Sequence, residues 1–208
     1  MKKLLSVLSE RADLYVIASW IEEGKNILDL GCGDGELLEY LISKKNVTGT
    51  GVEIDKERMI LCTRKGIPVI DHDLNNLFPF IDDQTFDYVI LSQTLQQLKK
   101  PAEVIDEIVR ISKYAILSFP NFGHYRIRLG LLLTGRMPKS RVLPYSWYDT
   151  PNIHLLTYYD FKEYCRSKNY KIVKTFFIKN NRLKKSLLFP NITSEACVVM
   201  IKAEGKKL

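Results

Sequence analysis

The chain has 208 residues, of which 46% are hydrophobic and 26% are charged, and its formal net charge is +7. This composition is typical of globular proteins, and a chain of this length buries roughly 70% of its unfolded surface without metal or disulfide crosslinks. Length and composition therefore favour a single domain over 1–208 and exclude a disordered, collagen-like or coiled-coil chain.

The sequence gives no indication of a metal site, a secretory signal or a membrane span. Two lysines and two leucines stand near the N-terminus, but Glu10, Arg11 and Asp13 interrupt any signal-peptide core. No apolar run approaches the roughly 18 residues that a membrane helix needs. We therefore expect a soluble, reduced, cytoplasmic protein without a metal. The cysteines form neither a CxxC pair nor a paired zinc-ligand pattern: Cys32, Cys62, Cys165 and Cys197.

Charge divides the chain into an acidic half and a basic half. Residues 1–104 contain 12 basic and 17 acidic residues, whereas residues 105–208 contain 19 basic and 7 acidic residues. A basic half can bind an anionic substrate, an acidic protein partner or nucleic acid. It can equally consist of solvated helix faces and a lysine-rich tail, since no base-stacking aromatic motif accompanies the charges. Charge alone leaves these alternatives open.

Apolar runs alternate with helical patterns along the first part of the chain. The apolar spacing near the N-terminus predicts a helix over 4–23 that stops at Gly24. The alternation that follows is of the β-α-β-α kind, which predicts a doubly wound, mostly parallel Rossmann-like sheet with helices on both faces. Strands are predicted over 26–30, 47–54, 86–91 and 114–119, and a further strand starts with residues 67–70 and ends near residues 71–73. Helices are predicted over 36–44, 55–65 and 102–111, the last opened by Pro101.

The pattern changes after the fifth predicted strand. Residues 120–156 are rich in aromatic residues, arginine, proline and asparagine, and we expect them to form a cap or insert on the domain. One more helix is predicted over 158–168, followed by two β-rich segments over 170–178 and 195–203. These two segments would form a C-terminal antiparallel hairpin, so the α/β sheet is expected to have seven strands.

A glycine-rich turn carries the clearest functional signal. Gly31-Cys32-Gly33-Asp34-Gly35 lies between a predicted strand and a predicted helix, where glycine permits a tight turn and the close approach of a ligand. A nicotinamide-binding GxGxxG fingerprint would need a glycine at the position of Glu36. The GxGxG form, with Asp29 in the preceding strand, instead resembles motif I of class I methyltransferases that use S-adenosylmethionine (SAM). Cys32 is interpreted as a small residue of this turn and not as a nucleophile.

Acidic residues at the ends of the next two strands extend this resemblance. Glu53 ends the second strand, where a carboxylate can accept both ribose hydroxyl groups, and Asp55 is expected to cap the next helix. The resemblance assigns Asp73, after the third strand, to the adenine amino group. The expected cofactor is SAM or its demethylated product S-adenosylhomocysteine (SAH), held by Asp29, Gly31, Cys32, Gly33, Gly35, Glu53, Ile54, Asp73, Leu74, Ser92 and Gln93.

One residue after the fourth strand departs from the methyltransferase pattern. Many small-molecule methyltransferases have histidine where this chain has Gln97. A glutamine side chain cannot act as a general base at neutral pH. The departure therefore concerns catalysis and leaves the expected binding of the cofactor unchanged.

Several stretches outside this core resemble the family of methionine biosynthesis protein MetW. They are residues 90–96, 118–126 and 135–138, and the most distinctive one reads Leu-Pro-Tyr-Ser-Trp-Tyr-Asp-Thr-Pro-Asn-Ile-His at 143–154. With the glycine turn, the resemblance runs from about residue 13 to the C-terminus. It implies a SAM-methyltransferase-like fold, a cytoplasmic location, a link to methionine biosynthesis and an association with homoserine O-acyltransferase, which activates homoserine for sulfur incorporation. It supplies no methyl acceptor.

Residues 120–156 leave the sheet at the edge where ligands bind, and three interpretations of them stay open. They could form an acceptor pocket in which arginine clamps a carboxylate. They could form a docking surface, since tyrosine, tryptophan and arginine dominate interface hot spots. They could also be a packed cap with internally bonded polar groups. The candidate catalytic residues in this segment are His124, His154, Asn121, Tyr145 and Asp149.

Two functions are compatible with these patterns. The first is an accessory or regulatory subunit that binds SAM or SAH and acts with homoserine O-acyltransferase, so that cofactor occupancy reports pathway output. The second is an active methyltransferase on a small polar metabolite, because methyl transfer needs chiefly the orientation of the acceptor. Nucleic-acid methylation is disfavoured, because Ser92-Gln93-Thr94-Leu95 stands where amino-methylating enzymes of that class often carry an Asn/Asp-Pro-Pro-aromatic motif.

Overall fold

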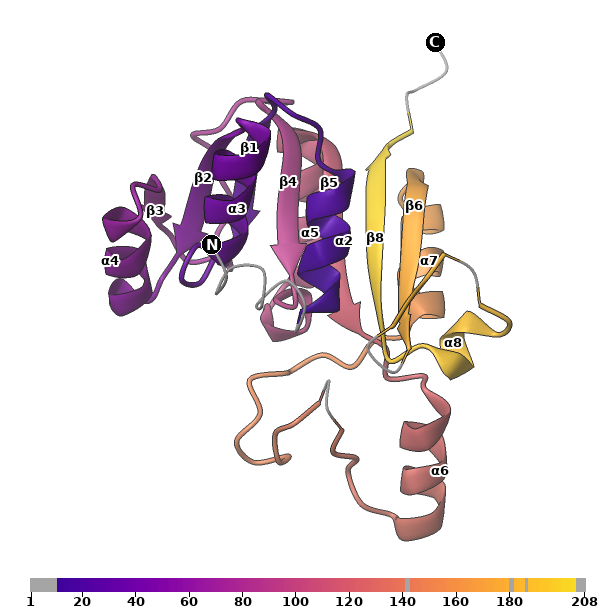
Figure 1. The fold of residues 1–208 in the computed structure, drawn as a ribbon. Coiled ribbons are helices and arrows are strands. Elements are labelled where there is room, and N and C mark those ends of the chain that lie inside the picture. The colour runs from indigo at the N-terminus through magenta and orange to yellow at the C-terminus, as the bar shows by residue number, and fades with distance from the viewer. Residues whose placement is uncertain (1–10, 141–142, 180–181, 186, 205–208) are drawn as a thin grey trace.

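The computed structural model describes residues 11–140, 143–179, 182–185 and 187–204. Its centre is one twisted sheet (Figure 1). The strands are β1 (Asn26–Leu30), β2 (Thr48–Glu53), β3 (Val69–Asp71), β4 (Phe86–Ser92), β5 (Ser112–Pro120), β6 (Tyr170–Lys179), β7 (Arg182–Lys184) and β8 (Ala196–Ala203).

The strand order is β3-β2-β1-β4-β5-β8-β6-β7. The strands β1 to β5 pair in parallel, whereas β8 pairs antiparallel with both β5 and β6. Strand order reverses between β1 and β4, and ligands of doubly wound sheets bind beside such a switch point. The predicted α/β class and the C-terminal antiparallel hairpin are confirmed.

Helices cover both faces of the sheet (Figure 1). One face is packed by α2 (Ala12–Trp20), α3 (Glu36–Lys45) and α4 (Lys56–Arg64), and the other by α5 (Pro101–Ile111) and α7 (Tyr158–Ser167). Alternate residues of the central strands enter the two cores: Ile27 and Ile90 face the first group, while Leu28 and Leu91 face the second. Burial on both faces explains why these strands are continuous apolar runs in the sequence.

The predicted helix boundaries have local causes that the structure shows. Asp55 caps α4 by accepting hydrogen bonds from the amides of Glu57 and Arg58, as predicted. Pro101 occupies the first position of α5, where its missing amide hydrogen costs no hydrogen bond. Thr157 and Asp160 form a reciprocal capping box at the start of α7.

The structure also differs from the sequence-based prediction. Within the described residues the sheet has eight strands and not seven, because the short strand β7 pairs with the outer edge of β6. The helix predicted over 4–23 is described only as α2, which ends at Trp20, and residues 4–10 lie outside the described part of the chain. Two further helices were not predicted, α6 (Tyr125–Thr134) and α8 (Pro190–Thr193).

The helix α6 belongs to a segment that leaves the body of the molecule. Residues 124–156, called the arm below, begin after β5, run through α6 and return toward the carboxyl edge of the sheet (Figure 1). The helix buries only Ile127, so its apolar residues form no core-facing stripe, and this explains why the helix was not predicted. Among the described residues, no helix is long and apolar enough to cross a membrane.

Candidate cofactor site

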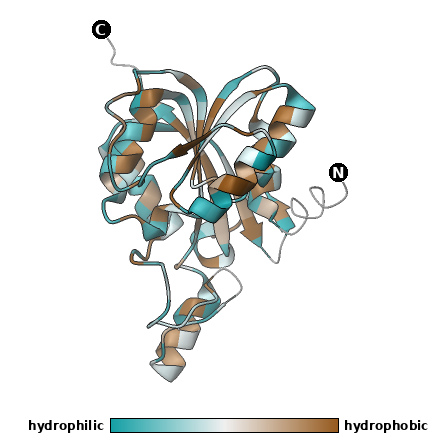
Figure 2. Ribbon diagram, turned by 90° about the vertical axis from the view of Figure 1, so that its left-hand side faces the viewer, coloured by the Kyte–Doolittle hydropathy of each residue, from teal (hydrophilic) through white to brown (hydrophobic). Residues whose placement is uncertain are grey.

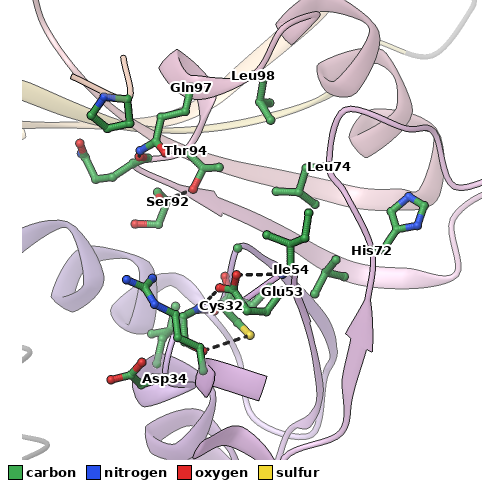
Figure 3. Close-up of a pocket in the computed structure, with 18 of the residues that line it drawn as sticks. Cys32, Asp34, Glu53, Ile54, His72, Leu74, Ser92, Thr94, Gln97 and Leu98 are labelled. Atoms are coloured by element: carbon green, nitrogen blue, oxygen red, sulfur yellow. Dashed lines mark hydrogen bonds between the residues drawn. The ribbon is translucent and has the colours of Figure 1, made fainter. Parts of the chain in front are cut away.

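A cavity of about 680 Å³ opens at the carboxyl edge of the sheet, beside the switch point. Its walls come from the glycine turn, from the end of β2, from the loop after β3 and from the segment after β4 (Figure 3). Ten of the eleven predicted cofactor residues line it together: Asp29, Gly31, Cys32, Gly33, Glu53, Ile54, Asp73, Leu74, Ser92 and Gln93.

The eleventh predicted residue, Gly35, serves the packing of the glycine turn. All three glycines of the turn have positive φ, at +72° for Gly31, +57° for Gly33 and +73° for Gly35. A Cβ atom on Gly35 would lie 2.7 Å from Ile67 Cδ1, so this position lets α3 approach the end of α4. A Cβ atom on Gly33 would approach only Arg58, at 3.7 Å, which leaves the backbone of Gly33 open toward the cavity.

Glu53 is held rigidly at the end of β2. Its Oε2 atom accepts a hydrogen bond from the amide of Gly33 at 2.9 Å, and its Oε1 atom accepts from Ile54 at 2.8 Å and Asp55 at 3.0 Å. The carboxylate therefore joins the glycine turn to β2 and is fixed with three charge-assisted bonds. A carboxylate oxygen has more than one acceptor site, so this group can still accept from ligand hydroxyl groups.

Asp29 on β1 is only 4% exposed and lines the same cavity. Burial raises the pKa of Asp29 to about 7, which nearby Arg11 opposes and the negative charge of Glu53 reinforces. The lining contains five acidic side chains, Asp29, Asp34, Glu36, Glu53 and Asp73, against two arginines. The cavity therefore favours a ligand that carries positive charge.

Arg11 enters the cavity from the start of α2 and is oriented by a buried acid. Its guanidinium donates to both carboxylate oxygens of Asp13, at 2.9 and 2.7 Å, and to Ser92 Oγ at 3.0 Å. Burial alone would raise the pKa of Asp13, but the hydrogen bonds and charge of Arg11 hold it below its ordinary value. Ser92 and Ser118 also donate to this carboxylate. This network fixes one guanidinium beside the acidic wall, where it can bind a carboxylate.

The loop after β3 forms the far end of the cavity. Asp73 Oδ1 accepts from the backbone and side-chain nitrogens of Asn75 at 2.9 and 2.8 Å, and the backbone bond is the main reason that the pKa of Asp73 is lowered. Leu74 and His72 flank this carboxylate on the cavity wall (Figure 3). An apolar side chain beside a carboxylate acceptor is suited to a flat heteroaromatic ring with an exocyclic amino group.

The segment after β4 closes the opposite wall. Gln93 has a left-handed backbone with φ of +54°, and its amide donates to the carbonyl of Ser118 at 2.9 Å. Such a conformation is costly for a residue other than glycine and is often found at ligand sites. Ser92, Thr94 and Gln97 extend from this segment across the cavity from Glu53 (Figure 3).

The five candidate catalytic residues do not lie together. Only Tyr145 lines the cavity, next to Pro151 of the same return segment. His124 lies in a separate hollow of about 220 Å³, where burial lowers its pKa and its Nδ1 atom accepts from the amide of Arg126. His154 lines another small hollow, and Asp149 is exposed on the arm.

Asn121, the fifth candidate, has a structural position at the base of the arm. Its fully buried side chain donates to the carbonyls of Asn191 at 2.9 Å and Ser194 at 2.8 Å, and it accepts from the amides of Gly123 and Tyr158. These bonds join β5 to α7 and α8. The set of residues predicted for an acceptor pocket is therefore dispersed over the arm and its base.

Cys32 and Cys62 are neighbours behind the glycine turn. Their sulfur atoms are 3.9 Å apart, and both thiols are close to the carbonyl of Gly33. Burial raises the pKa of both thiols, so the reactive thiolate form is disfavoured at neutral pH. Their position suits packing between the turn and α4. Among the described residues, no cluster of three or more histidine, cysteine or acidic side chains could hold a metal ion.

Sequence reasoning missed more than half of the cavity lining. His72 and Asn75 flank the predicted Asp73 and Leu74, so their place next to these residues in the sequence could have indicated that they line the cavity. Arg11 had no motif, because its place depends on how α2 packs against the sheet. The lining residues beyond the prediction, Tyr145 aside, are Arg11, Leu14, Asp34, Glu36, Leu37, Val52, Arg58, His72, Asn75, Thr94, Gln97, Leu98 and Pro151.

Comparison with known sequences gives one family over nearly the whole chain. The family model described as methionine biosynthesis protein MetW matches residues 11–201. The bifunctional methionine biosynthesis protein MetXA/MetW of Rhodopirellula baltica is 34% identical over 213 residues, which cover 97% of this chain and 34% of that protein. The chain therefore spans about one third of the length of this relative.

Comparison with solved structures gives the fold. A SAM-dependent methyltransferase from Thermotoga maritima superposes with a TM-score of 0.65 at 16% identity, covering 95% of this chain and 92% of the other. Magnesium protoporphyrin IX methyltransferase from Synechocystis, solved with bound SAM, gives a TM-score of 0.61 at 15% identity, covering 95% and 81%. The chain has the Rossmann-like fold of class I SAM methyltransferases.

Proposed function

Since the chain belongs to the family of methionine biosynthesis protein MetW, we propose that it is an accessory subunit that binds SAM or SAH and acts with homoserine O-acyltransferase. The observation that carries this proposal is the relative from Rhodopirellula baltica, whose printed name joins MetXA and MetW in one bifunctional polypeptide. This chain matches one third of that polypeptide. We take the MetXA part to be the homoserine O-acyltransferase with which the resemblance connects the family. The proposed subunit would act in methionine biosynthesis, in the cytoplasm.

The geometry of the cavity supports SAM or SAH as its ligand. Glu53 would accept the ribose hydroxyl groups, and Asp73 with Leu74 would hold the adenine. The ammonium of the methionine moiety would lie at the acidic wall formed by Asp29, and Arg11 would bind its carboxylate. When bound, SAM supplies an activated methyl group on a positively charged sulfur. Every residue named here already lies on one wall or another of a single cavity.

A short chain of hydrogen bonds connects this cavity to the arm. The Gln96 side chain donates to the carbonyl of Gln93 at 2.8 Å, and the Gln96 carbonyl accepts from the amides of Ile153 at 2.9 Å and His154 at 3.0 Å. Because Gln93 lines the cavity and Ile153 lies in the arm, ligand binding can shift the equilibrium of the arm through this connection. Such coupling would let cofactor occupancy change the affinity for the partner, as feedback requires.

The distribution of histidines favours the accessory role over methyl transfer. His124 and His154 lie in hollows outside the cavity, and His72 lies at its adenine end. Gln97, which stands where many methyltransferases have histidine, lines the cavity but cannot remove a proton from an acceptor. Methyl transfer to a small polar metabolite is the alternative function, and Tyr145 at the cavity is the residue that would orient such an acceptor.

The test is the activity of the same organism's homoserine O-acyltransferase, measured with and without this chain and with and without SAM. We expect the chain to raise the activity and SAM to change the size of the rise. The variant Gly33→Val places a side chain at the open part of the glycine turn and should abolish SAM binding. Gly24→Val is the matched control, because Gly24 also has positive φ, +69°, but does not line the cavity.

Three results are informative. A rise in acyltransferase activity that responds to SAM only when Gly33 is intact supports the whole proposal. A rise that Gly33→Val leaves unchanged, despite lost SAM binding, would confine the function to the arm and refute cofactor control. No rise, together with a methylated product from a screen of homoserine-pathway metabolites, would establish the alternative function instead.

A further inference from the structure

The helix α6 exposes an apolar stripe. Tyr125, Leu129, Leu132 and Leu133 are spaced so that they share one side of the helix. Leu132 is 78% exposed and Leu133 is 79% exposed. In Figure 2, α6 is the lowest helix, and brown apolar segments cover much of it away from the body of the molecule. A monomer gains nothing in stability from leucines in water, so this stripe needs another explanation.

The return segment adds aromatic residues to the exposed part of the arm. Trp147 is 76% exposed, and its ring packs edge to face on that of Tyr148, with centroids 5.6 Å apart. Tryptophan and tyrosine are the residue types most enriched in interface hot spots. The stripe on α6 and this aromatic pair are two exposed apolar groups of the same arm, and together they are called the leucine–tryptophan surface below; its members are Tyr125, Leu129, Leu132, Leu133, Trp147 and Tyr148.

The leucine–tryptophan surface is separate from the lining of the cavity. Of the described residues of the arm, only Tyr145 and Pro151 line the cavity, and no member of the leucine–tryptophan surface does. Within α6 only Ile127 is buried, so the helix is held to the body by its base and not by its stripe. The exposed leucines are therefore unexplained by cofactor binding or by the packing of the described residues.

The charged residues of the described part of the arm are mainly basic. Arg126, Arg128, Arg136 and Lys139 are basic and Asp149 is acidic, whereas residues 1–104 of the chain carry net negative charge. A partner suited to this surface would present an apolar groove with an acidic rim, because a rim of opposite charge speeds encounter and fixes register. A helix of ten residues is about 15 Å long, which is the size that helix-in-groove recognition uses.

We propose that the leucine–tryptophan surface is the docking surface for homoserine O-acyltransferase, which receives α6 in an apolar groove with an acidic rim. This inference rests on the proposed function, because it takes its occupant from there. The match to the bifunctional relative covers 97% of this chain, which includes the arm. We take the remaining two thirds of that polypeptide to be the part named MetXA. The arm is the part of the described chain that extends furthest from the body, so it can reach a neighbouring module without covering the cavity (Figure 1).

The experiment measures the affinity of the full chain for the acyltransferase of the same organism by isothermal titration calorimetry. The double variant Leu132→Glu with Leu133→Glu places two negative charges against an acidic rim, and glutamate is a good helix former, so α6 should persist. The dissociation constant is expected to rise by at least about 30-fold, as for the loss of hot-spot residues. Trp147→Ala, tested separately, should weaken binding in the same direction.

The matched control is Ile60→Glu, an equivalent change on α4. Ile60 is 51% exposed and belongs to neither the cavity lining nor the arm, and its helix α4 lies far from α6 (Figure 1). This variant should bind the acyltransferase as the unmodified chain does. Retained SAM binding in all variants shows that each one is folded.

The outcomes separate the two proposals. If the unmodified chain binds the acyltransferase and the double variant binds equally well, the docking surface is refuted and the proposed function survives. If the unmodified chain does not bind it, both are refuted. Sedimentation that shows a dimer of the chain, lost in the double variant, would make a second copy the occupant. Flotation of the chain with vesicles of anionic phospholipid, lost in the same variant, would make it a membrane surface, and either result overturns this proposal.

Discussion

The cavity wall and the arm use their side chains in opposite ways. At the cavity, Glu53 is buried and accepts three backbone hydrogen bonds, and Asp13 is buried while it orients Arg11. In the arm, Leu132 and Leu133 are largely exposed, and their helix is held by its base. A fixed polar site and an exposed apolar surface therefore occur in one chain. The first is organised before a ligand arrives, whereas the second is completed only by something outside the described residues.

This difference indicates which region would carry each of the two parts of the proposed function, cofactor binding and partner binding. A ligand cavity gains affinity when its polar groups are held in place in advance, because little ordering is then needed on binding. A docking helix gains affinity mainly from apolar area that is removed from water on association. The hydrogen bonds of Gln96 join the two regions, so each can be altered separately and its effect on the other measured.

The largest expected effect is at the base of the arm. Asn121→Ala removes the fully buried amide that bonds to α7 and α8, and it leaves the carbonyls of Asn191 and Ser194 without their donor. Several buried hydrogen bonds are lost at once, so the free energy of unfolding should fall by about 3 kcal/mol. Urea denaturation followed by circular dichroism measures it. Asn152→Ala, an asparagine of the arm that is only half-buried, is the control and should change it by less than about 0.5 kcal/mol.

The next largest effect is expected at the cavity alone. Glu53→Ala removes the carboxylate that fixes the glycine turn and would accept the ribose hydroxyls, so SAM affinity should fall by about 100-fold or more. Titration calorimetry with SAM and SAH measures the loss. Glu57→Ala, on the exposed first turn of α4, should leave the affinity unchanged. Equal losses for both variants would show that the cavity is not the SAM site.

The third effect, which is smaller than the first two, is the dependence of SAM affinity on pH. Because the pKa of Asp29 is about 7, this side chain is mostly neutral below pH 7 and mostly ionised above it. Only the ionised form attracts the ammonium of SAM, so binding below pH 7 requires the loss of a proton. SAM affinity should therefore fall by up to about tenfold per pH unit as the pH drops below 7, and it should level off above that value.

The control for the pH effect is Asp29→Asn, measured by the same titrations between pH 5.5 and 8.5. This variant has no group at that position to ionise, so its SAM affinity should vary little over the range and should resemble that of the protonated protein. A profile with the same slope as that of the unmodified chain would show that Asp29 is not the source of the pH dependence.

Much of the sheet could be predicted from the sequence because its causes are local or periodic. The apolar run 26–30 and the glycines after it specify a strand and a turn, and Asp55 and Pro101 mark helix starts within a few residues. The same locality explains why ten of the predicted cofactor residues meet in one cavity, since each lies at or just beyond the carboxyl end of a strand of a parallel sheet. Strand β7 could not be predicted in this way, because three residues at a sheet edge carry no period.

The positions of the arm residues could not be predicted, because they depend on distant contacts. His124 and Asn121 are polar residues in an aromatic segment, a pattern equally typical of a catalytic pocket and of a structural joint. Asn121 has a structural role because its side chain donates to the carbonyl of Asn191 in α8, some 70 positions later in the chain. Arg11 likewise lies at the cavity partly because Ser92, 81 positions away, bonds both to it and to its partner Asp13. Such long-range partners leave no trace in local spacing.

The smallest expected effect is the one that best separates the two regions. Leu133→Ala removes an apolar side chain that is 79% exposed, so the free energy of unfolding of the isolated chain should change by less than about 0.5 kcal/mol. A buried leucine, such as Leu117 on β5, should cost about 2–5 kcal/mol when changed in the same way, because a cavity is left in the core. Thermal or urea unfolding of the two variants compares them directly. A large loss for Leu133→Ala would mean that α6 is covered in the isolated chain, and the leucine–tryptophan surface would then be unable to receive a partner. A negligible loss would leave the exposed leucines without a role in folding and would assign them to binding.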